Sequence, residues 1–206
     1  MGSGILRCQR GVMQLPVGTL RPINGKDGGK LALTLSKSGN PEIYVMDIAS
    51  RALRQITTHY GIDTEAVWMP DGQTLLFTSD RGGKPQIYQI SAAGGEAKRV
   101  TFTGEYNARA TVSYDGRKIA TAQGTGSIYR IALLDRSFGG NGRSQLLSPG
   151  NLDESPSFAP NASMILYATK EGRRGVLYAV SADGRVRQRL VLSEGDVREP
   201  AWSPYR

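Results

Sequence analysis

The feature that most constrains this chain is a repeat of about 44 residues that occurs four times. One copy, "PDGQTLLFTSDRGGKPQIYQI", begins at Pro70 and contains a tight turn, an apolar run, a glycine-rich hairpin and a strand with a tyrosine. The equivalent turn positions lie 44, 44 and 46 residues apart, at Asp27, Asp71, Asp115 and Asn161. A period of this length with a constant internal order is typical of β-propellers, in which each repeat forms one blade.

Each repeat is expected to form four short β-strands and no helix. The second strand alternates or is apolar throughout, as in "TLLFTS", and the fourth strand is polar, which suits the exposed edge of a blade. A blade cannot bury both faces of its sheet alone, so neighbouring blades must stack. Seven recurrent aromatic residues are therefore predicted to pack between blades: Tyr44, Trp68, Tyr88, Tyr129, Phe158, Tyr178 and Trp202.

The predicted fold is all-β, a partial β-propeller with four visible four-stranded blades. We expect the blades at about 20–64, 65–108, 109–154 and 155–198, followed by a final strand at 199–206 that begins a fifth repeat. Residues 1–19 match no blade, and we expect them to be an altered or disordered N-terminus. Four blades are at the low end for a closed propeller, so a larger ring is favoured.

The side chains that enzymes most often use are scarce. His59 is the single histidine, which excludes a multi-histidine metal site, and no G-x-S-x-G elbow precedes a serine. "GKDGGK" lacks the spacing of a phosphate-binding loop, and the Asp-Gly turns lack the further oxygen ligands of a calcium loop. Cys8 stands alone, so no internal disulfide is possible. We therefore expect no catalytic residue, cofactor or metal.

The formal net charge is +8, from 26 basic and 18 acidic residues. The basic residues are scattered over turns and strands, which favours solvated strand faces. An acidic protein partner remains an alternative, and nucleic acid is disfavoured. No apolar stretch approaches the roughly 18 residues of a membrane span, and residues 1–20 show no secretory signal.

The candidate binding residues lie in the loops that join one blade to the next. In a propeller the first strand is innermost, so these loops surround one mouth of the central channel. Tyr and Arg are favoured anchors at protein interfaces, although loops are also polar simply because they are wet. The candidate set is His59, Tyr60, Asp63, Glu65, Tyr106, Asn107, Arg109, Asp153, Glu154, Arg198 and Glu199.

These repeats resemble the TolB family of β-propellers. The stretch "NPEIYVMDIASRALRQITTHYGIDTEAVWMPDGQTLLFTSDRGGKPQIYQI" and the ending "EPAWSPYR" carry the resemblance, which covers residues 27–206. No Trp-Asp dipeptide ends a blade, so a WD40 propeller fits less well. The resemblance implies an α/β domain followed by a six-bladed ring. This chain would hold the last four blades of that ring.

The resemblance also implies a non-catalytic function in the periplasm. Proteins of this family bind the peptidoglycan-associated lipoprotein Pal at the propeller mouth, and other Tol proteins through their N-terminal region. The system is associated with outer-membrane integrity, protein import and envelope constriction at cell division. One alternative is a gating propeller of a prolyl-oligopeptidase-like serine peptidase that lacks its hydrolase domain. Another is a free-standing scaffold propeller.

Overall fold

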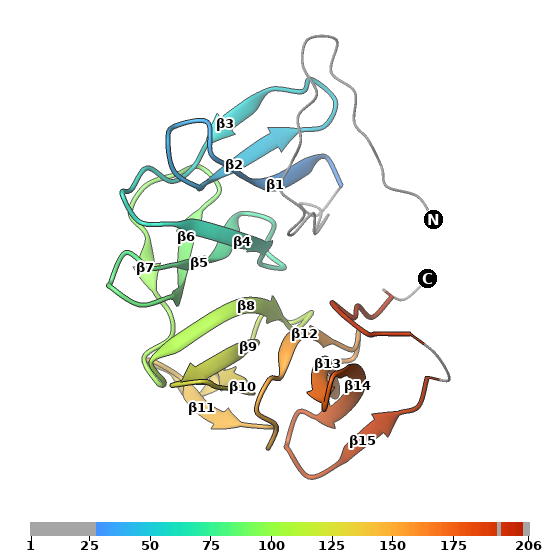
Figure 1. Ribbon diagram of the computed structural model, residues 1–206. Coiled ribbons are helices and arrows are strands. Elements are labelled where there is room, and N and C mark those ends of the chain that lie inside the picture. The colour runs from blue at the N-terminus through green and yellow to red at the C-terminus, as the bar shows by residue number, and fades with distance from the viewer. Residues whose placement is uncertain (1–27, 193–194, 204–206) are drawn as a thin grey trace.

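The computed structural model describes residues 28–192 and 195–203, which form four antiparallel sheets arranged in an arc around a common axis (Figure 1). We name them blades 1 to 4 in chain order. Residues 1–27 lie outside the described residues, and with them the unmatched segment 1–19, Cys8, the turn residue Asp27 and the expected first strand of blade 1.

Three of the blades have four strands, and blade 1 has three within the described residues. In every blade the strands follow one another as an up-and-down meander. Blade 1 contains β1 (Lys30–Leu35), β2 (Glu42–Asp47) and β3 (Leu53–Gln55). Blade 2 contains β4 (Asp63–Trp68), β5 (Thr74–Ser79), β6 (Gln86–Ser91) and β7 (Lys98–Arg99).

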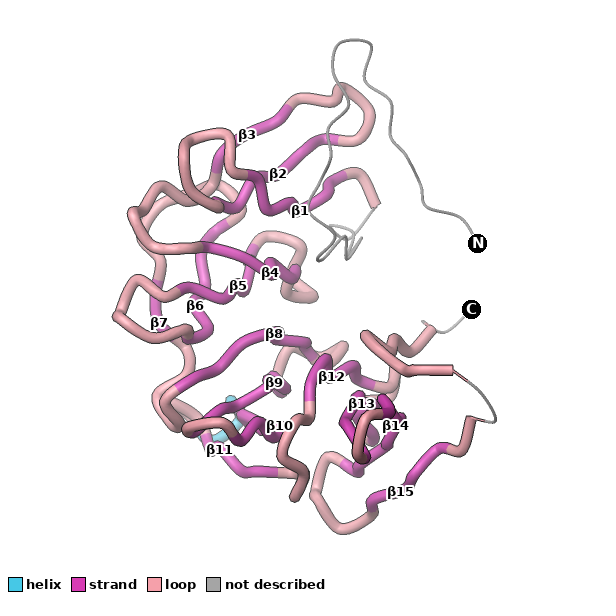
Figure 2. The backbone as a smooth tube through the Cα atoms, in the orientation of Figure 1, coloured by secondary structure: helices cyan, strands magenta, loops and turns pink. Residues whose placement is uncertain are grey.

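Blades 3 and 4 repeat this order. Blade 3 contains β8 (Tyr106–Val112), β9 (Lys118–Thr125), β10 (Ile128–Asp135) and β11 (Arg143–Leu146), and blade 4 contains β12 (Glu154–Phe158), β13 (Met164–Glu171), β14 (Arg174–Ser181) and β15 (Arg187–Leu190). The one helix of the described residues is the three-residue 3-10 helix η1 (Arg136–Phe138), so none there could cross a membrane (Figure 2). The all-β propeller fold expected from the repeat is confirmed.

The turn between the first and second strands shows why the sequence repeats as it does. Asp71 Oδ1 accepts hydrogen bonds from the backbone N–H groups of Gln73 and Thr74 at 2.8 and 2.9 Å. Gly72 has a φ of 67°, which costs glycine little. Asp115 and Gly116 repeat the arrangement in blade 3. These aspartates are turn residues, and each turn directs the chain back along the sheet.

The hydrophobic core lies between the blades. Trp68 and Tyr88 of blade 2 pack against blade 1, in a cluster that includes Ile43 and Val45. Phe158 and Tyr178 of blade 4 pack in the cluster shared with blade 3. A third cluster joins blades 2 and 3. These four aromatic residues therefore stack the blades, as the repeat predicted. Tyr44 lies in a cluster of blade 1 residues alone, and Tyr129 lies edge-on to Tyr106 of its own blade, so the prediction does not hold for them within the described residues.

The last predicted element, a strand at 199–206, is not found in its described part. Residues 199–203 form no strand, and the Trp202 side chain is 38% exposed instead of packed between blades. A strand requires a neighbour with which to exchange backbone hydrogen bonds, and the described residues contain no such neighbour for this segment. The Trp202 N–H donates a hydrogen bond to Ser157 Oγ of blade 4 at 3.1 Å.

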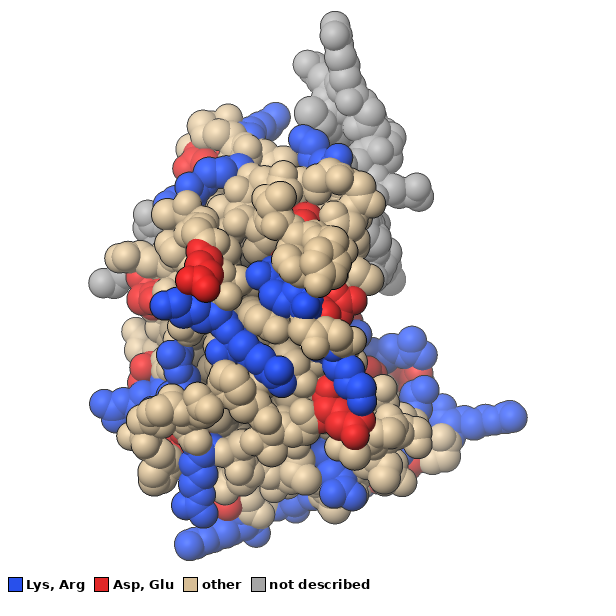
Figure 3. All heavy atoms as spheres, turned by 90° about the vertical axis from the view of Figure 1, so that its left-hand side faces the viewer, with Lys and Arg blue, Asp and Glu red and all other residues tan. Residues whose placement is uncertain are grey.

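The outermost strands are short and basic. β7 is Lys98–Arg99, and β15 carries Arg187 and Arg189 at exposed positions. Figure 3, which shows the left-hand side of Figure 1, has Lys and Arg spread over that surface with Asp and Glu among them. Short, charged edge strands resist pairing with strands of other chains.

Candidate partner-binding face

Two faces of the arc must be distinguished. The loop face carries the connections from the last strand of one blade to the first strand of the next, residues 56–62, 100–105 and 147–153. The turn face, on the opposite side, carries the tight turns 69–73, 113–117 and 159–163. All eleven candidate residues lie in or just after the connections of the loop face, or in the equivalent segment 195–199.

Blades 2, 3 and 4 share a backbone irregularity near the loop face. The pairing of the first strand with the second shifts by one residue after Thr64, Ala108 and Glu154, which is a β-bulge. The next residues, Glu65, Arg109 and Ser155, have φ values of 57°, 55° and 55°. Glu199, which follows Ser155 by 44 residues, has a φ of 48°.

Left-handed backbone costs a residue other than glycine roughly 1 kcal/mol or more. A strained backbone that recurs at equivalent positions suggests that the direction of these side chains matters.

The side chains of the three bulge residues and of Glu199 meet at the guanidinium of Arg109. Arg109 Nε lies 3.3 Å from Glu65 Oε1, and Arg109 Nη1 lies 3.3 Å from Glu199 Oε1. Arg109 Nη1 also donates a hydrogen bond to Ser155 Oγ at 2.7 Å. One side chain of blade 3 therefore connects blade 2, blade 4 and the segment that follows blade 4.

This cluster remains accessible to a partner. The Arg109 side chain is 35% exposed and that of Glu199 is 60% exposed. Ion pairs in contact with water contribute about 0–1 kcal/mol, so exchange of one carboxylate for another costs little. Glu65 is held more firmly, because it accepts hydrogen bonds from the Arg109 N–H at 2.9 Å and the Thr78 hydroxyl at 2.8 Å.

Three of the candidates lie beneath the surface. Asp63 and Asp153 are fully buried and Asn107 is 1% exposed, so none of them can be a direct partner contact. The sequence suggested otherwise because their neighbours are polar loop residues. Each is part of a buried joint that fixes a connection between two blades.

The joint between blades 1 and 2 is built from carboxylates. The Thr57 hydroxyl accepts from the Ile43 N–H at 2.9 Å and donates to Glu42 Oε2 at 2.5 Å. Asp63 Oδ2 pairs with Arg81 Nη2 at 2.6 Å. Burial raises the pKa of Asp63, and the charge of nearby Glu42 raises it further, while a hydrogen bond from Ser79 and the charge of Arg81 lower it.

The joint between blades 2 and 3 places amides at the same positions. Thr101 accepts from the Ile87 N–H at 3.0 Å and donates to Gln86 Oε1 at 2.7 Å. Asn107 Nδ2 donates to the same oxygen at 2.9 Å, and the Thr121 hydroxyl donates to Asn107 Oδ1 at 3.1 Å.

In the joint between blades 3 and 4, Ser148 accepts from the Ile131 N–H at 2.8 Å and donates to Asp153. The three joints therefore share one backbone plan.

The other candidates differ in how far they reach the surface. Tyr60 is 87% exposed, and its ring lies 4.1 Å from that of His59, which is half-buried. Tyr106 is half-buried with its ring edge-on to Tyr129, and burial raises the pKa of its hydroxyl. Glu154 is half-buried, and Arg198 is exposed and pairs with Asp196 at 3.4 Å.

Sequence reasoning missed two residues that build this face. Ser155 contacts Arg109, and Glu42 anchors the His59 N–H at 2.7 Å. The signal for Ser155 was its position, because it follows Asp153 at the same offset as Glu65 follows Asp63. Glu42 had no such signal, since it opens a strand.

The described residues contain no group of three or more His, Cys, Asp or Glu side chains that could hold a metal ion. One three-stranded and three four-stranded antiparallel sheets, stacked around an axis with a strained, charged and partly exposed cluster near it, define a β-propeller fold. The family model described as the TolB beta propeller domain matches residues 7–206, so the chain belongs to the TolB propeller family. The match begins inside the segment that the repeat alignment left unmatched.

Close relatives carry the same family name. The Tol-Pal system protein TolB of Xanthomonas campestris pv. campestris (strain B100) is 73% identical over 106 residues, which is 52% of this chain and 24% of that protein. The chain therefore matches about a quarter of the length of these curated relatives.

Solved structures agree on the fold. The crystal structure of TolB from Acinetobacter baumannii has a TM-score of 0.79 at 50% identity and covers 86% of this chain and 44% of its own. A putative TolB from Agrobacterium tumefaciens has a TM-score of 0.76 at 19% identity, covering 87% of this chain and 64% of its own. Puromycin hydrolase, at 15% identity and a TM-score of 0.65, covers 79% of this chain and 27% of its own, and shares the fold alone.

Proposed function

We propose that this chain is the non-catalytic, partner-binding propeller portion of a Tol–Pal system protein, and that its loop face binds the lipoprotein Pal. The full ring would have six blades and would act in the periplasm. Contact with other Tol proteins would be made by an N-terminal region that precedes these blades. The names of the relatives support the system, and the convergence of bulge residues on Arg109 supports the loop face.

The face offers the chemistry that a protein interface uses. Tyr60 presents an exposed aromatic ring, and Arg198 and Glu199 present charges of both signs at the same face. Aromatic and arginine side chains supply most hot spots of protein interfaces. The buried joints beneath hold the connections in place, so the entropic cost of ordering them on binding is small.

The experiment measures binding of the soluble domain of Pal to the 206-residue chain by isothermal titration calorimetry. Tyr60→Ala and Arg198→Glu each are expected to weaken binding about tenfold, typical of interface residues. The turn face supplies matched controls. Tyr114 is 84% exposed, and Arg185 pairs with an aspartate two residues earlier at 3.7 Å, as Arg198 does.

Tyr114→Ala and Arg185→Glu should leave the affinity within twofold. Equal losses at both faces would contradict the assignment of the loop face. Absence of any Pal binding by the folded chain would contradict Pal as the partner.

A further inference from the structure

The inner edge of blade 1 is a second feature with the character of a binding site. In blades 2 to 4 the second strand lies between the first and the third. β1 holds the position of a second strand, because Lys30 precedes Thr74 of β5 by 44 residues, yet it pairs with β2 alone within the described residues. An unpaired edge of this kind is a template for a strand from another chain.

The segment 199–203 holds the position of a first strand. It follows the middle of β12 by 44 residues, and Glu199 has a φ of 48° where the bulge residue Ser155 has a φ of 55°. Trp202 takes the place of Phe158, which is 8% exposed, but is itself 38% exposed. The segment therefore has the backbone bulge and the aromatic residue of a first strand, and its ring is only partly covered.

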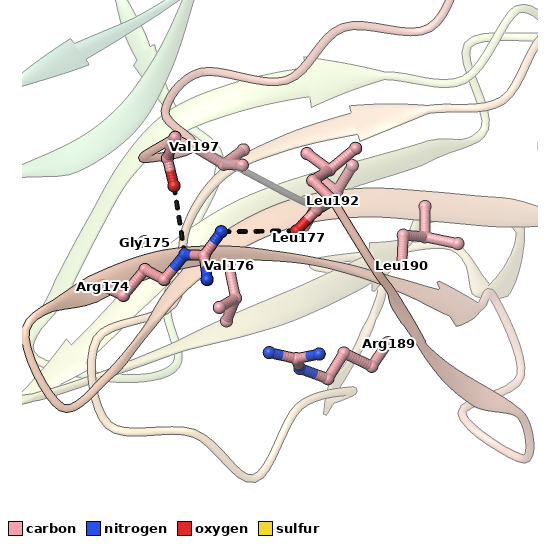
Figure 4. A pocket seen from close by; sticks show the side chains of 9 residues that line it. Arg174, Gly175, Val176, Leu177, Arg189, Leu190, Leu192 and Val197 are labelled. Atoms are coloured by element: carbon pink, nitrogen blue, oxygen red, sulfur yellow. Dashed lines mark hydrogen bonds between the residues drawn. The ribbon is translucent and has the colours of Figure 1, made fainter.

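The start of this segment is held on blade 4. Arg174 donates hydrogen bonds to the carbonyl oxygens of Leu192 and Gly195 at 3.3 and 3.1 Å (Figure 4). The Gly175 N–H donates to Asp196. The cavity enclosed by these contacts has a volume of about 10 Å³, which is room for one water. Blade 4 therefore presents residues 199–203 from a fixed point.

The segment and the edge of β1 match in register. In blade 2, Thr64 of the first strand lies opposite Thr78 of the second, and blades 3 and 4 keep this register. The repeat places Arg198 at the position of Thr64, and Thr34 at that of Thr78. Both remain accessible, since the Arg198 side chain is 74% exposed and Thr34 is half-buried.

One polar pair makes the match specific. The Thr78 hydroxyl donates to Glu65 at 2.8 Å, and this bond joins the second strand of blade 2 to its bulge. Alanine occupies the position of Thr78 in blades 3 and 4. Thr34 and Glu199 are the residues at the equivalent positions of β1 and the segment. The segment therefore carries the carboxylate that complements the hydroxyl of β1.

We propose that residues 199–203 of one copy of this chain complete blade 1 of a second copy, and that the exchange is reciprocal. Each copy supplies one strand and one edge, so the contact closes at two copies. Main-chain hydrogen bonds to β1 supply affinity, and the Thr34 hydroxyl of the second copy donates to Glu199. Trp202 then packs between its own blade 4 and blade 1 of the second copy. The exchange does not require Pal.

Two single-cysteine chains test the register. In a Cys8→Ser background, one chain carries Arg198→Cys and the other carries Thr34→Cys. Mixed and oxidised with copper phenanthroline, they should form a disulfide-linked heterodimer, because opposed residues of paired strands lie within reach of a disulfide. Lys30→Cys lies four residues away on β1 and is the control, and its yield with Arg198→Cys should be about tenfold lower.

Sedimentation equilibrium measures the affinity. The 206-residue chain should approach twice its mass of 22.2 kDa as its concentration rises. Trp202→Ala and Thr34→Val should each raise the dissociation constant about tenfold. Tyr114→Ala and Thr125→Val change exposed residues outside the proposed contact and should leave it within about twofold.

Three results would overturn the proposal. A chain that stays at 22.2 kDa at every concentration would exclude the exchange. A heterodimer yield no higher than that of the Lys30→Cys control would exclude the register. Equal effects of all four substitutions on the dissociation constant would show association without a defined contact. Thermal melting of each variant checks that it is folded, so that a loss of association reports on the edge of β1.

Discussion

The joints that connect blade 1 to blade 2 and blade 2 to blade 3 have the same backbone geometry and opposite chemistry. Glu42 and Asp63 are buried carboxylates in the first, and Gln86 and Asn107 are buried amides in the second. In both, a threonine hydroxyl accepts from a strand N–H and donates to the side chain that opens the strand. The fold therefore fixes where a polar group must be, but either a charged carboxylate or a neutral amide can occupy the position.

The difference has an energetic consequence. An amide joint is neutral, so its hydrogen bonds satisfy it at any pH. A carboxylate joint must pair its charge, because a buried charge without a partner costs several kcal/mol. Arg81 supplies that partner for Asp63, so blades 1 and 2 depend on a single cation in a way that blades 2 and 3 do not.

The largest expected effect comes from removal of that cation. Arg81→Met should lower the free energy of unfolding by about 3 kcal/mol at pH 7, because it leaves Asp63 charged and unpaired at full burial. Lys84→Met breaks an exposed pair with Glu105 on the same face and should cost less than about 1 kcal/mol. Urea denaturation measures both, and equal losses would show that the joint does not depend on its charge.

The second effect is a pH dependence confined to the carboxylate joint. The pKa of Asp63 is raised above its usual 3.8 by burial, so the folded state binds its proton more tightly than the unfolded state. Its contribution to stability is present below pH 3.8 and is lost as the pH rises through the raised folded-state pKa. Asp63→Asn, which copies Asn107, should abolish this loss.

The measurement is the urea midpoint of both proteins between pH 3.5 and 7. The midpoint of Asp63→Asn relative to that of the unmodified chain should rise with pH. Asn107→Asp is the reciprocal control, and it should bring a new loss of stability to the joint between blades 2 and 3. If the urea midpoints of all three proteins changed with pH in parallel, the raised pKa of Asp63 could not be the cause of the pH dependence.

These joints also show what could be predicted from the sequence. The 44-residue spacing and the Asp-Gly turns predicted the strands and the stacking of Trp68 and Phe158, because turn chemistry and alternation are local properties. The burial of Asp63, Asn107 and Asp153 is set by the neighbouring blade, so polar loop composition alone suggested surface residues. The bulge at Arg109 was missed because its residue type carries no signal of positive φ. The strand at 199–206 was expected from a pattern that cannot tell whether a partner strand is present.

The third prediction concerns the tight turns, in which the same backbone conformation recurs in three blades with different residues. Gly72 and Gly116 have positive φ, and Ala162 of blade 4 has a φ of 57° at the equivalent position. Ala162→Gly should relieve about 1 kcal/mol of strain and lose part of its methyl packing on the cluster of blades 3 and 4. The net gain should be about 0.5 kcal/mol.

Gly72→Ala is the matched change in the opposite direction. It should lower the unfolding free energy by about 1 kcal/mol, since alanine then adopts the same left-handed backbone. Thermal and urea denaturation of the two variants measure the pair. A loss of stability in Ala162→Gly larger than that in Gly72→Ala would show that packing, and not backbone strain, dominates this turn.

The smallest expected effect lies at the cluster around Arg109, where two glutamates contact one guanidinium from different elements. Glu199→Gln should change the unfolding free energy by about 0.3 kcal/mol or less, because its pair with Arg109 is 3.3 Å long and the carboxylate is 60% exposed. Glu65→Gln should cost about 1 kcal/mol, since Glu65 also accepts from the Arg109 N–H and the Thr78 hydroxyl. If the two variants lost the same stability, the segment after blade 4 would be held to the axis as firmly as blade 2. A near-zero effect for Glu199→Gln would instead leave Arg109 free to exchange that carboxylate for one from a partner.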